Sequence, residues 1–246
     1  MSRTSRIVMA ILVTAATSFP VIVGAAGKLT EVDTAHLIFM RSEEKLARDV
    51  YLTLAEMYPE QTVFLTIATK AEQTHTDTMA TMLGKFRILD PEPSTALDTL
   101  PPSEQIGVFE NYYFAEYFAD KYDFLVGLGG LGLFEALNVG ALIEELDMHD
   151  INYCNDVFYQ DYPKPLPEYP DCGGLSVTAV RALQNSLGEL LAGSESHLCA
   201  FVSQIGPLMA DDECYSAQYL TQHEVYDIIE AECIEFIGFI CLPEHE

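Results

Sequence analysis

Carboxylates and imidazoles interrupt the apolar faces of several segments whose hydrophobic residues recur at helical spacing. The clearest case is Glu72-Gln73-Thr74-His75, in which a carboxylate and an imidazole three residues apart lie on one side of a helix and can both reach one metal ion. That side is also the apolar one, because Ala71, Met79 and Met82 share it. Taken alone, the pair is also typical of a surface ion pair or of a core histidine with a hydrogen-bond partner.

Four segments show this helical spacing, and together they predict an all-α fold. The ranges are Thr34–Tyr58, Thr62–Phe86, Phe134–Ile151 and Ser176 to about Gln204. Pro59 ends the first helix, Ser176 is a typical N-cap for the fourth, and Gly206-Pro207 ends the fourth.

Each predicted helix carries at least one candidate ligand on its apolar row. Several Glu together with His form the ligand set for iron or manganese in helical bundles, and bound ions remove the cost of burying carboxylates. We therefore hypothesise an interior metal site, and its candidate ligands are Glu44, Glu72, His75, Glu144, Asp147 and His197. The alternative for Glu44, Glu144 and Asp147 is a solvated helix face, a role that we assign to their neighbours Glu43 and Glu145.

A long connection separates the second and third helices. It contains four prolines, then an aromatic stretch from Phe109 to Tyr122 that can form a helix of its own, then a turn region at Gly127–Gly132. A bundle with one long crossover requires such a connection. Beyond the fourth helix, Thr221 and Glu224 have capping-box spacing and predict a short helix to about Phe239. We expect a bundle domain at 34–205 and a C-terminal extension at 206–246.

The N-terminus has the pattern of a secretory signal peptide over residues 1–26. Two arginines precede an apolar stretch from Ile7 to Val23, and Gly24-Ala25-Ala26 forms a small-residue cleavage site. The alternative is a membrane anchor, but Thr14 and Pro20 are among the residues that interrupt the apolar stretch. We expect a secreted or periplasmic protein with no stable membrane insertion once the signal is removed.

Charge and cysteine content agree with export. Acidic residues outnumber basic ones 38 to 12, so the surface should repel nucleic acid and attract cations; solubility in a salty medium explains the same excess. All six cysteines lie in the second half of the chain and predict three disulfides in an oxidising compartment. A structural zinc site is a weaker alternative, since no Cys-x-x-Cys pair occurs.

Four motifs resemble known ferritin-like proteins. The run from Glu44 to Tyr51 resembles the first-helix motif of rubrerythrins and bacterioferritins, and Glu72-Gln73-Thr74-His75 resembles their second-helix ligand pair. The chain is more closely similar to a ferritin-like family known only as domain of unknown function 2202. The runs that carry this similarity are Met40–Tyr51, Ala71–Asp77, Gly140–Asp147 and Gly193–Phe201.

The resemblance implies a ferritin-like four-helix bundle holding two iron ions, with manganese as a substitute, and a disulfide-linked helical extension. It implies Glu44, Glu72 and His75 around one ion, Glu144 and His197 around the other, and Glu72 or Glu144 as a bridge. Ser194 stands where related proteins have Glu, so a ligand is missing unless Asp147 replaces it.

The expected partners are metal ions and oxygen or peroxide, in an oxidase, peroxidase or ferroxidase type of reaction. Tyr51, two turns from Glu44, is the candidate catalytic residue, as a donor of a hydrogen bond or an electron; its alternative is core packing. Two other functions stay open: a secreted structural or binding module with a weak, single or absent metal site, and simple metal sequestration.

Overall fold

The computed structural model describes residues 28–155, 157–168 and 173–243, so the predicted signal peptide lies outside the described residues. Within these ranges the protein is helical and has no strand, apart from one isolated parallel bridge between Tyr215 and Ile240. The longer helices are α1 (Glu31–Met57), α3 (Gln73–Phe86), α4 (Ala115–Gly129), α5 (Leu133–Asn152), α7 (Arg181–Ile205) and α8 (Gln222–Glu232). The shorter elements are α2 (Thr62–Ile67), η1 (Ala68–Glu72), η2 (Ser103–Gln105), α6 (Val157–Asp161), η3 (Gly206–Leu208) and η4 (Ile234–Phe239).

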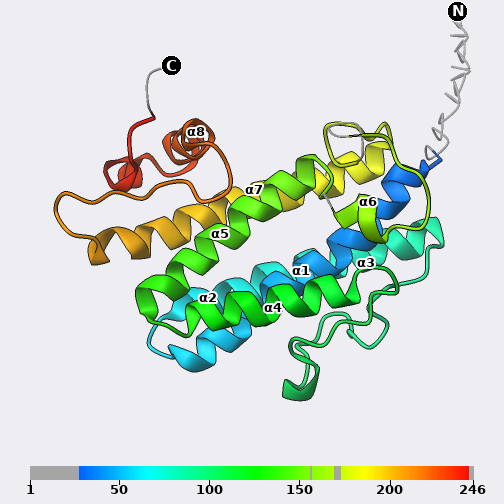
Figure 1. Cartoon of the computed structure of the whole chain (residues 1–246), viewed down its shortest axis with the longest axis horizontal. Helices are drawn as coiled ribbons and strands as arrows, with labels where there is room; N and C mark the ends of the chain where they lie inside the picture. The colour runs from blue at the N-terminus through cyan, green and yellow to red at the C-terminus, as the bar shows by residue number, and fades with distance from the viewer. Residues whose placement is uncertain (1–27, 156, 169–172, 244–246) are drawn as a thin grey trace, which may run out of the picture.

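Helix α1 is the central element and is buried on almost every side (Figure 1). Its first turn is closed by a capping box, in which Asp33 N donates to Thr30 Oγ1 at 3.1 Å and Thr30 N donates to Asp33 Oδ2 at 2.8 Å. The apolar row predicted for it is buried throughout, from Leu37 to Leu54. The helix contacts α3, α4 and α5, while α5 and α7 lie along each other and α7 returns to α3. These contacts enclose one interior between α1, α3, α5 and α7.

The second predicted helix is one continuous rod with a defect in its middle. Helix α2 passes directly into the π-helical turn η1, which passes into α3. A π turn inserts an extra residue into the helical register and is common at functional sites. Here it ends at Glu72, the residue that begins the Glu-x-x-His pair.

Two predicted boundaries were wrong. The aromatic helix begins at Ala115 rather than Phe109 and extends to Gly129, so Gly127 and Gly129 are helical and the turn narrows to Gly130–Gly132. The fourth predicted helix, α7, begins at Arg181 rather than after Ser176. The Ser176 hydroxyl does not cap a helix because it donates to Asn152 O at 2.5 Å and ties the loop to the end of α5.

The C-terminal extension folds against α7. Helix α8 has the capping box predicted at Thr221 and Glu224, and the 3₁₀ helix η4 follows it. One disulfide joins Cys199 of α7 to Cys233, and a second joins Cys214 to Cys241 within the extension. The described part of the chain has no free cysteine, but the third predicted disulfide stays a prediction because Cys172 lies outside that part. Among the described residues, no helix is long and apolar enough to cross a bilayer.

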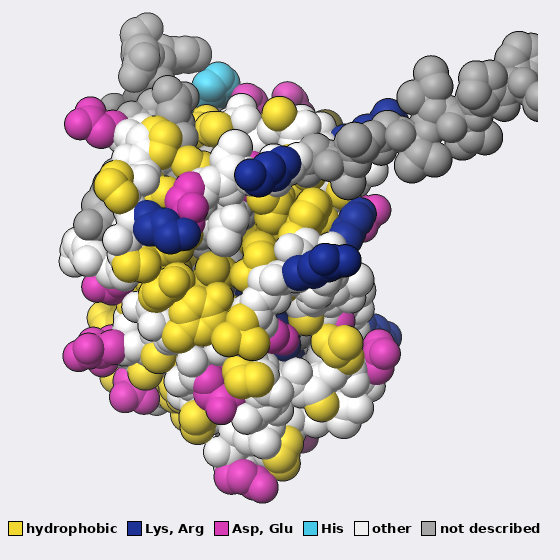
Figure 2. Space-filling view, turned by 90° about the vertical axis from the view of Figure 1, so that its right-hand side faces the viewer, with side chains coloured by type: hydrophobic (Ala, Val, Ile, Leu, Met, Phe, Trp, Pro, Cys, Tyr) yellow, Lys and Arg dark blue, Asp and Glu magenta, His cyan; other side chains and the backbone are white. Residues whose placement is uncertain are grey.

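Charged side chains are unevenly distributed over the surface. Figure 2 shows one end of the molecule, where hydrophobic side chains form a patch with Lys and Arg side chains around its upper part. Acidic side chains lie mainly toward the rim of the same view (Figure 2). The few basic residues of this acidic chain are therefore partly gathered at one end.

Candidate metal centre

Five of the predicted ligands meet in the interior between α1, α3, α5 and α7. Their side chains come from four different segments, and each residue is at least nine-tenths buried; they are Glu44, Glu72, His75, Glu144 and His197. Among the described residues their ligand atoms form two groups, and within each group the atoms lie within 4.8 Å of one another. Glu44, Glu72 and His75 make the first group, and Glu72, Glu144 and His197 make the second. Glu72 therefore belongs to both.

The Glu72 carboxylate faces an imidazole with each of its oxygens. Its Oε2 lies 3.5 Å from His75 Nδ1, and its Oε1 lies 3.0 Å from His197 Nδ1. His75 Nδ1 also lies 3.3 Å from Glu44 Oε2, and His197 Nδ1 lies 3.3 Å from Glu144 Oε2. Both imidazoles thus point the same ring nitrogen at carboxylates from two helices.

Tyr51 lies at one end of this cluster. Its hydroxyl donates toward Glu144 Oε1 at 2.5 Å and lies 3.1 Å from Gly140 O, and the residue is fully buried. The structure thus places Tyr51 against Glu144 on α5 rather than against Glu44 on its own helix. Such a hydrogen bond fixes one oxygen of Glu144 and leaves the other toward His197.

Asp147 lies beside the cluster but belongs to neither group of ligand atoms. Its Oδ2 accepts a hydrogen bond from the hydroxyl of Ser194, the residue three before His197 on α7. Its Oδ1 is buried without a hydrogen-bond partner. Asp147 thus contacts the residue at the position of the expected ligand, and it does not join either group of ligand atoms.

Burial and close packing shift the pKa values of the whole cluster. Burial raises the pKa of Glu44 to about 7, against the opposing effect of His75. Burial alone would raise the pKa of Glu72, but the imidazoles of His75 and His197 outweigh it and lower the pKa. Burial would likewise lower the pKa of His197, but Glu144 and Glu72 raise it to about 10. The two imidazoles thus lie against the three buried carboxylates as positive partners.

Several atoms of the cluster are shielded from solvent and make no hydrogen bond, and all but Glu44 Oε1 have only the imidazole–carboxylate contacts of 3.0–3.5 Å given above. They are both carboxylate oxygens of Glu44, Oε1 of Glu72 and Nδ1 of His75. Buried polar atoms without partners are rare and costly, because they lose water and gain nothing in return. A divalent ion bound between carboxylates and imidazoles removes this cost, and this donor set suits iron, manganese or zinc. The residues present therefore fit a bound metal.

Two residues assigned to solvated faces are in fact buried. Glu145 is fully buried because the C-terminal extension covers it, and its carboxylate accepts from Tyr215 Oη and from three successive backbone N–H groups, those of residues 218–220, at 2.6–2.9 Å. Glu43 is 9% exposed. Burial raises its pKa, and the nearby charges of Asp150 and Asp147 raise it further. Helical spacing alone did not predict the burial of Glu43 or of Glu145, because it depends on segments that lie far away in the sequence.

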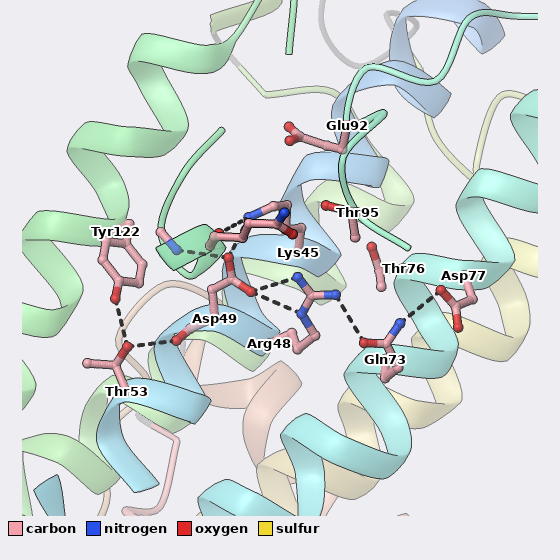
Figure 3. Close-up of polar contacts among 12 residues, drawn as sticks. Lys45, Arg48, Asp49, Thr53, Gln73, Thr76, Asp77, Glu92, Thr95 and Tyr122 are labelled. Carbon is pink, nitrogen blue, oxygen red and sulfur yellow. Dashed lines mark hydrogen bonds and ion pairs between the residues drawn. The ribbon is translucent and has the colours of Figure 1, made fainter. Parts of the chain in front are cut away.

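A buried charged network connects the helices that carry the ligands (Figure 3). Asp49 accepts from Lys45 Nζ at 2.5 Å and from two nitrogens of Arg48 at 2.8 and 3.0 Å. Arg48 also donates to Gln73 Oε1 at 3.0 Å, and Gln73 directly follows Glu72. The network, which sequence reasoning missed, therefore holds α1 and α3 in register one residue away from the candidate ligand.

Comparison with known proteins places the chain in a family. A model described as an uncharacterized protein domain, DUF2202, matches residues 33–160. The chain is 33% identical over 204 residues to the uncharacterized protein MJ0754 of Methanocaldococcus jannaschii, covering 82% of this chain and 89% of that protein. It also resembles the crystal structure of hypothetical protein MJ0754 from Methanococcus jannaschii, with a TM-score of 0.63, 32% identity, and coverage of 82% and 94% of the two chains. The chain therefore belongs to the DUF2202 family.

Proposed function

We propose that this protein is a ferritin-like protein that binds two metal ions, iron or manganese, and reacts with oxygen or peroxide. The observation that carries the proposal is the pair of ligand groups sharing Glu72, each with two carboxylates and one imidazole. Supporting the ferritin-like topology are the contacts of α1 with α3 and of α5 with α7, joined by the long connection between α3 and α5.

Bound iron supplies the redox chemistry for oxygen or peroxide, and the protein supplies the environment. Glu44 and His75 would hold one ion, Glu144 and His197 would hold the other, and Glu72, which belongs to both groups, would bridge them. Tyr51 orients Glu144 through its hydroxyl and is the nearest group able to donate a proton or an electron at that carboxylate. Burial of all five ligands keeps bulk water away from the centre.

Metal analysis of the purified protein tests this function. After anaerobic loading with Fe²⁺ or Mn²⁺ and desalting, we expect close to two ions per chain. The Glu72→Ala, His75→Ala variant should retain only trace metal, because it removes a residue shared by both groups. The control is Glu116→Ala, His223→Ala, which makes the same chemical changes at exposed positions. Trace metal in the wild type, or equal metal in both variants, would contradict the proposal.

A one-metal function is favoured by a single observation. Ser194 donates its hydroxyl to Asp147, so α7 contributes only His197 to the second group and no carboxylate. A stoichiometry of one ion per chain, lost in the double variant, would support a mononuclear site or a sequestering role. Oxygen consumption during Fe²⁺ loading separates a reactive centre from one that only stores metal.

A further inference from the structure

An apolar cavity of about 190 Å³ lies between α1, α4 and α5 and is also lined by Tyr219 of the C-terminal extension. Its walls are mostly aliphatic and aromatic, with Leu46, Leu125 and Ile143 among the buried lining residues. Phe124, which is 57% exposed, lies at the rim. Ligand pockets for drug-sized molecules measure roughly 300–1,000 Å³, so this cavity suits a smaller molecule.

Two carboxyl groups interrupt the apolar wall of this cavity. Glu43 is 9% exposed and Asp147 is 4% exposed, so they belong to its deep end. Glu43 Oε2 and Asp147 Oδ1 are both buried without a donor, and the carboxyl group that faces Glu43 is that of Asp150. The Ser194 hydroxyl fixes the other oxygen of Asp147. The deep end therefore presents two acceptors that need a donor, which is costly to maintain without a ligand.

The cavity adjoins the candidate metal centre through shared helical turns. Asp147 follows Glu144 by one turn of α5, and Ala47, which also lines the cavity, follows Glu44 by one turn of α1. Residues three apart share a helix face, so the faces that carry Glu144 and Glu44 continue one turn further into the wall of the cavity.

We propose that the cavity binds a small primary amine with an apolar chain, whose ammonium group donates to Glu43 and Asp147. An ammonium group has only donors, which matches two acceptors, and the aliphatic walls match the chain. The strongly acidic chain attracts cations. Lys121 also lines the cavity, but its ammonium group lies 5.4 Å from the centre of the Tyr117 ring and makes a cation–π contact there. A role for this amine as a substrate of the metal centre rests on the proposed function, but its binding does not.

Calorimetry with the full chain tests the ligand class. We expect n-hexylamine to bind at one site, and n-hexanol and hexanoate to bind at least tenfold more weakly. Glu43→Gln keeps the shape of the side chain but replaces one carboxyl oxygen by an amide NH2, which cannot accept from an ammonium group, and should weaken hexylamine binding at least tenfold. The matched control Glu116→Gln makes the same change on the exposed side of α4 and should leave the affinity unaltered. Equal affinity for hexanol, or unaltered affinity in Glu43→Gln, would refute the amine assignment.

Two further variants keep the test decisive. Leu142→Trp narrows the cavity from its partly exposed side and should also abolish hexylamine binding, so the assignment does not depend on the folding of one variant. The Glu72→Ala, His75→Ala variant should lose metal but still bind hexylamine. If amine binding disappears in this variant and persists in Glu43→Gln, the amine binds among the metal ligands and the cavity proposal is overturned. If the wild type binds the amine but no metal, only the proposed function is overturned.

Discussion

Glu72 is the residue at which the two halves of the candidate centre meet. Its two oxygens face the two imidazoles, so neither half keeps its geometry if this side chain moves. The residues around it leave little free space. Gly193 on α7 has no side chain, and a Cβ there would lie 2.5 Å from His75 Cε1. The absence of a side chain at Gly193 is therefore what leaves room for the His75 ring.

Gly193→Ala should displace His75 and weaken metal binding in the first group. The added methyl group cannot fit beside the ring, and a misplaced imidazole cannot reach an ion held by Glu44. We expect a loss of about one ion per chain, measured by metal analysis after desalting. The control is Gly188→Ala on the same helix, where a Cβ meets nothing within 4 Å. This control should retain full metal and gain about 1 kcal/mol of stability from helix propensity; full metal in Gly193→Ala would contradict the prediction.

The protonation of the cluster predicts how stability depends on pH. The folded-state pKa of His197 is about 10, above the ordinary value of 6.5, so its stabilising contribution is complete below pH 6.5 and is lost as pH rises through 10. Glu44, with a raised pKa of about 7, also binds its proton more tightly in the folded state, so ionising it above pH 4.5 destabilises the fold. The metal-free protein should thus become less stable as pH rises.

Metal should reverse this trend, because ligands must lose their protons to bind an ion. The rise in melting temperature caused by Mn²⁺ should therefore be larger at pH 8 than at pH 6, as measured by thermal unfolding with and without the ion. In the Glu72→Ala, His75→Ala variant Mn²⁺ should cause no such rise at either pH. A larger effect of Mn²⁺ at pH 6 than at pH 8 in the wild type would show that the imidazoles do not bind the ion.

At the scale of helices, the sequence allowed the apolar rows to be predicted but not their defects. Leu37, Met40 and Tyr51 belong to a row of α1 in which residues recur every three or four positions, so the burial of that row follows from periodicity alone. The π turn that ends at Glu72 covers only five residues, which is too few for a change of period to be visible in the sequence. The burial of Glu145 depends on the extension, whose backbone reaches it only in the folded chain. Long-range contacts of this kind are not encoded in local spacing.

The register between α1 and α3 depends on Arg48. Arg48→Met would remove the donor to Gln73 Oε1, while Gln73 Nε2 keeps its bond to Asp77. It would also remove the two Arg48 nitrogens that donate to Asp49 and leave Asp49 with its bond from Lys45. Breaking a buried ion pair in this way costs about 3–5 kcal/mol, so we expect a comparable fall in the free energy of unfolding, measured with denaturant on the metal-free protein. Arg181→Met removes an exposed arginine at the start of α7 and should change stability by less than about 0.5 kcal/mol. Equal effects of the two substitutions would contradict the prediction.

For the molecule as a whole, the extension is joined to the helices that carry the ligands at two points. The Cys199–Cys233 disulfide joins it to α7 two residues after His197, and Glu145 joins it to α5 one residue after Glu144. The acidic excess of the chain disfavours compact packing through self-repulsion, which such links oppose.

Cys199→Ser, Cys233→Ser should therefore loosen the extension. The disulfide closes a segment with a sequence separation of 34, and the chain-entropy relation gives about 4 kcal/mol for a loop of this length. We expect a melting temperature lower by roughly 8–15 °C, and protease cleavage within residues 209–221 that the wild type resists. The control is Cys214→Ser, Cys241→Ser, which removes a disulfide with a sequence separation of 27 that lies wholly within the extension. It should lower the melting temperature similarly, but the Cys199–Cys233 disulfide still joins α8 to α7 in this variant. Because His197 lies on the helix that the first disulfide joins, metal content should fall in the first variant and not in the second; equal metal in both would show that the extension does not support the centre.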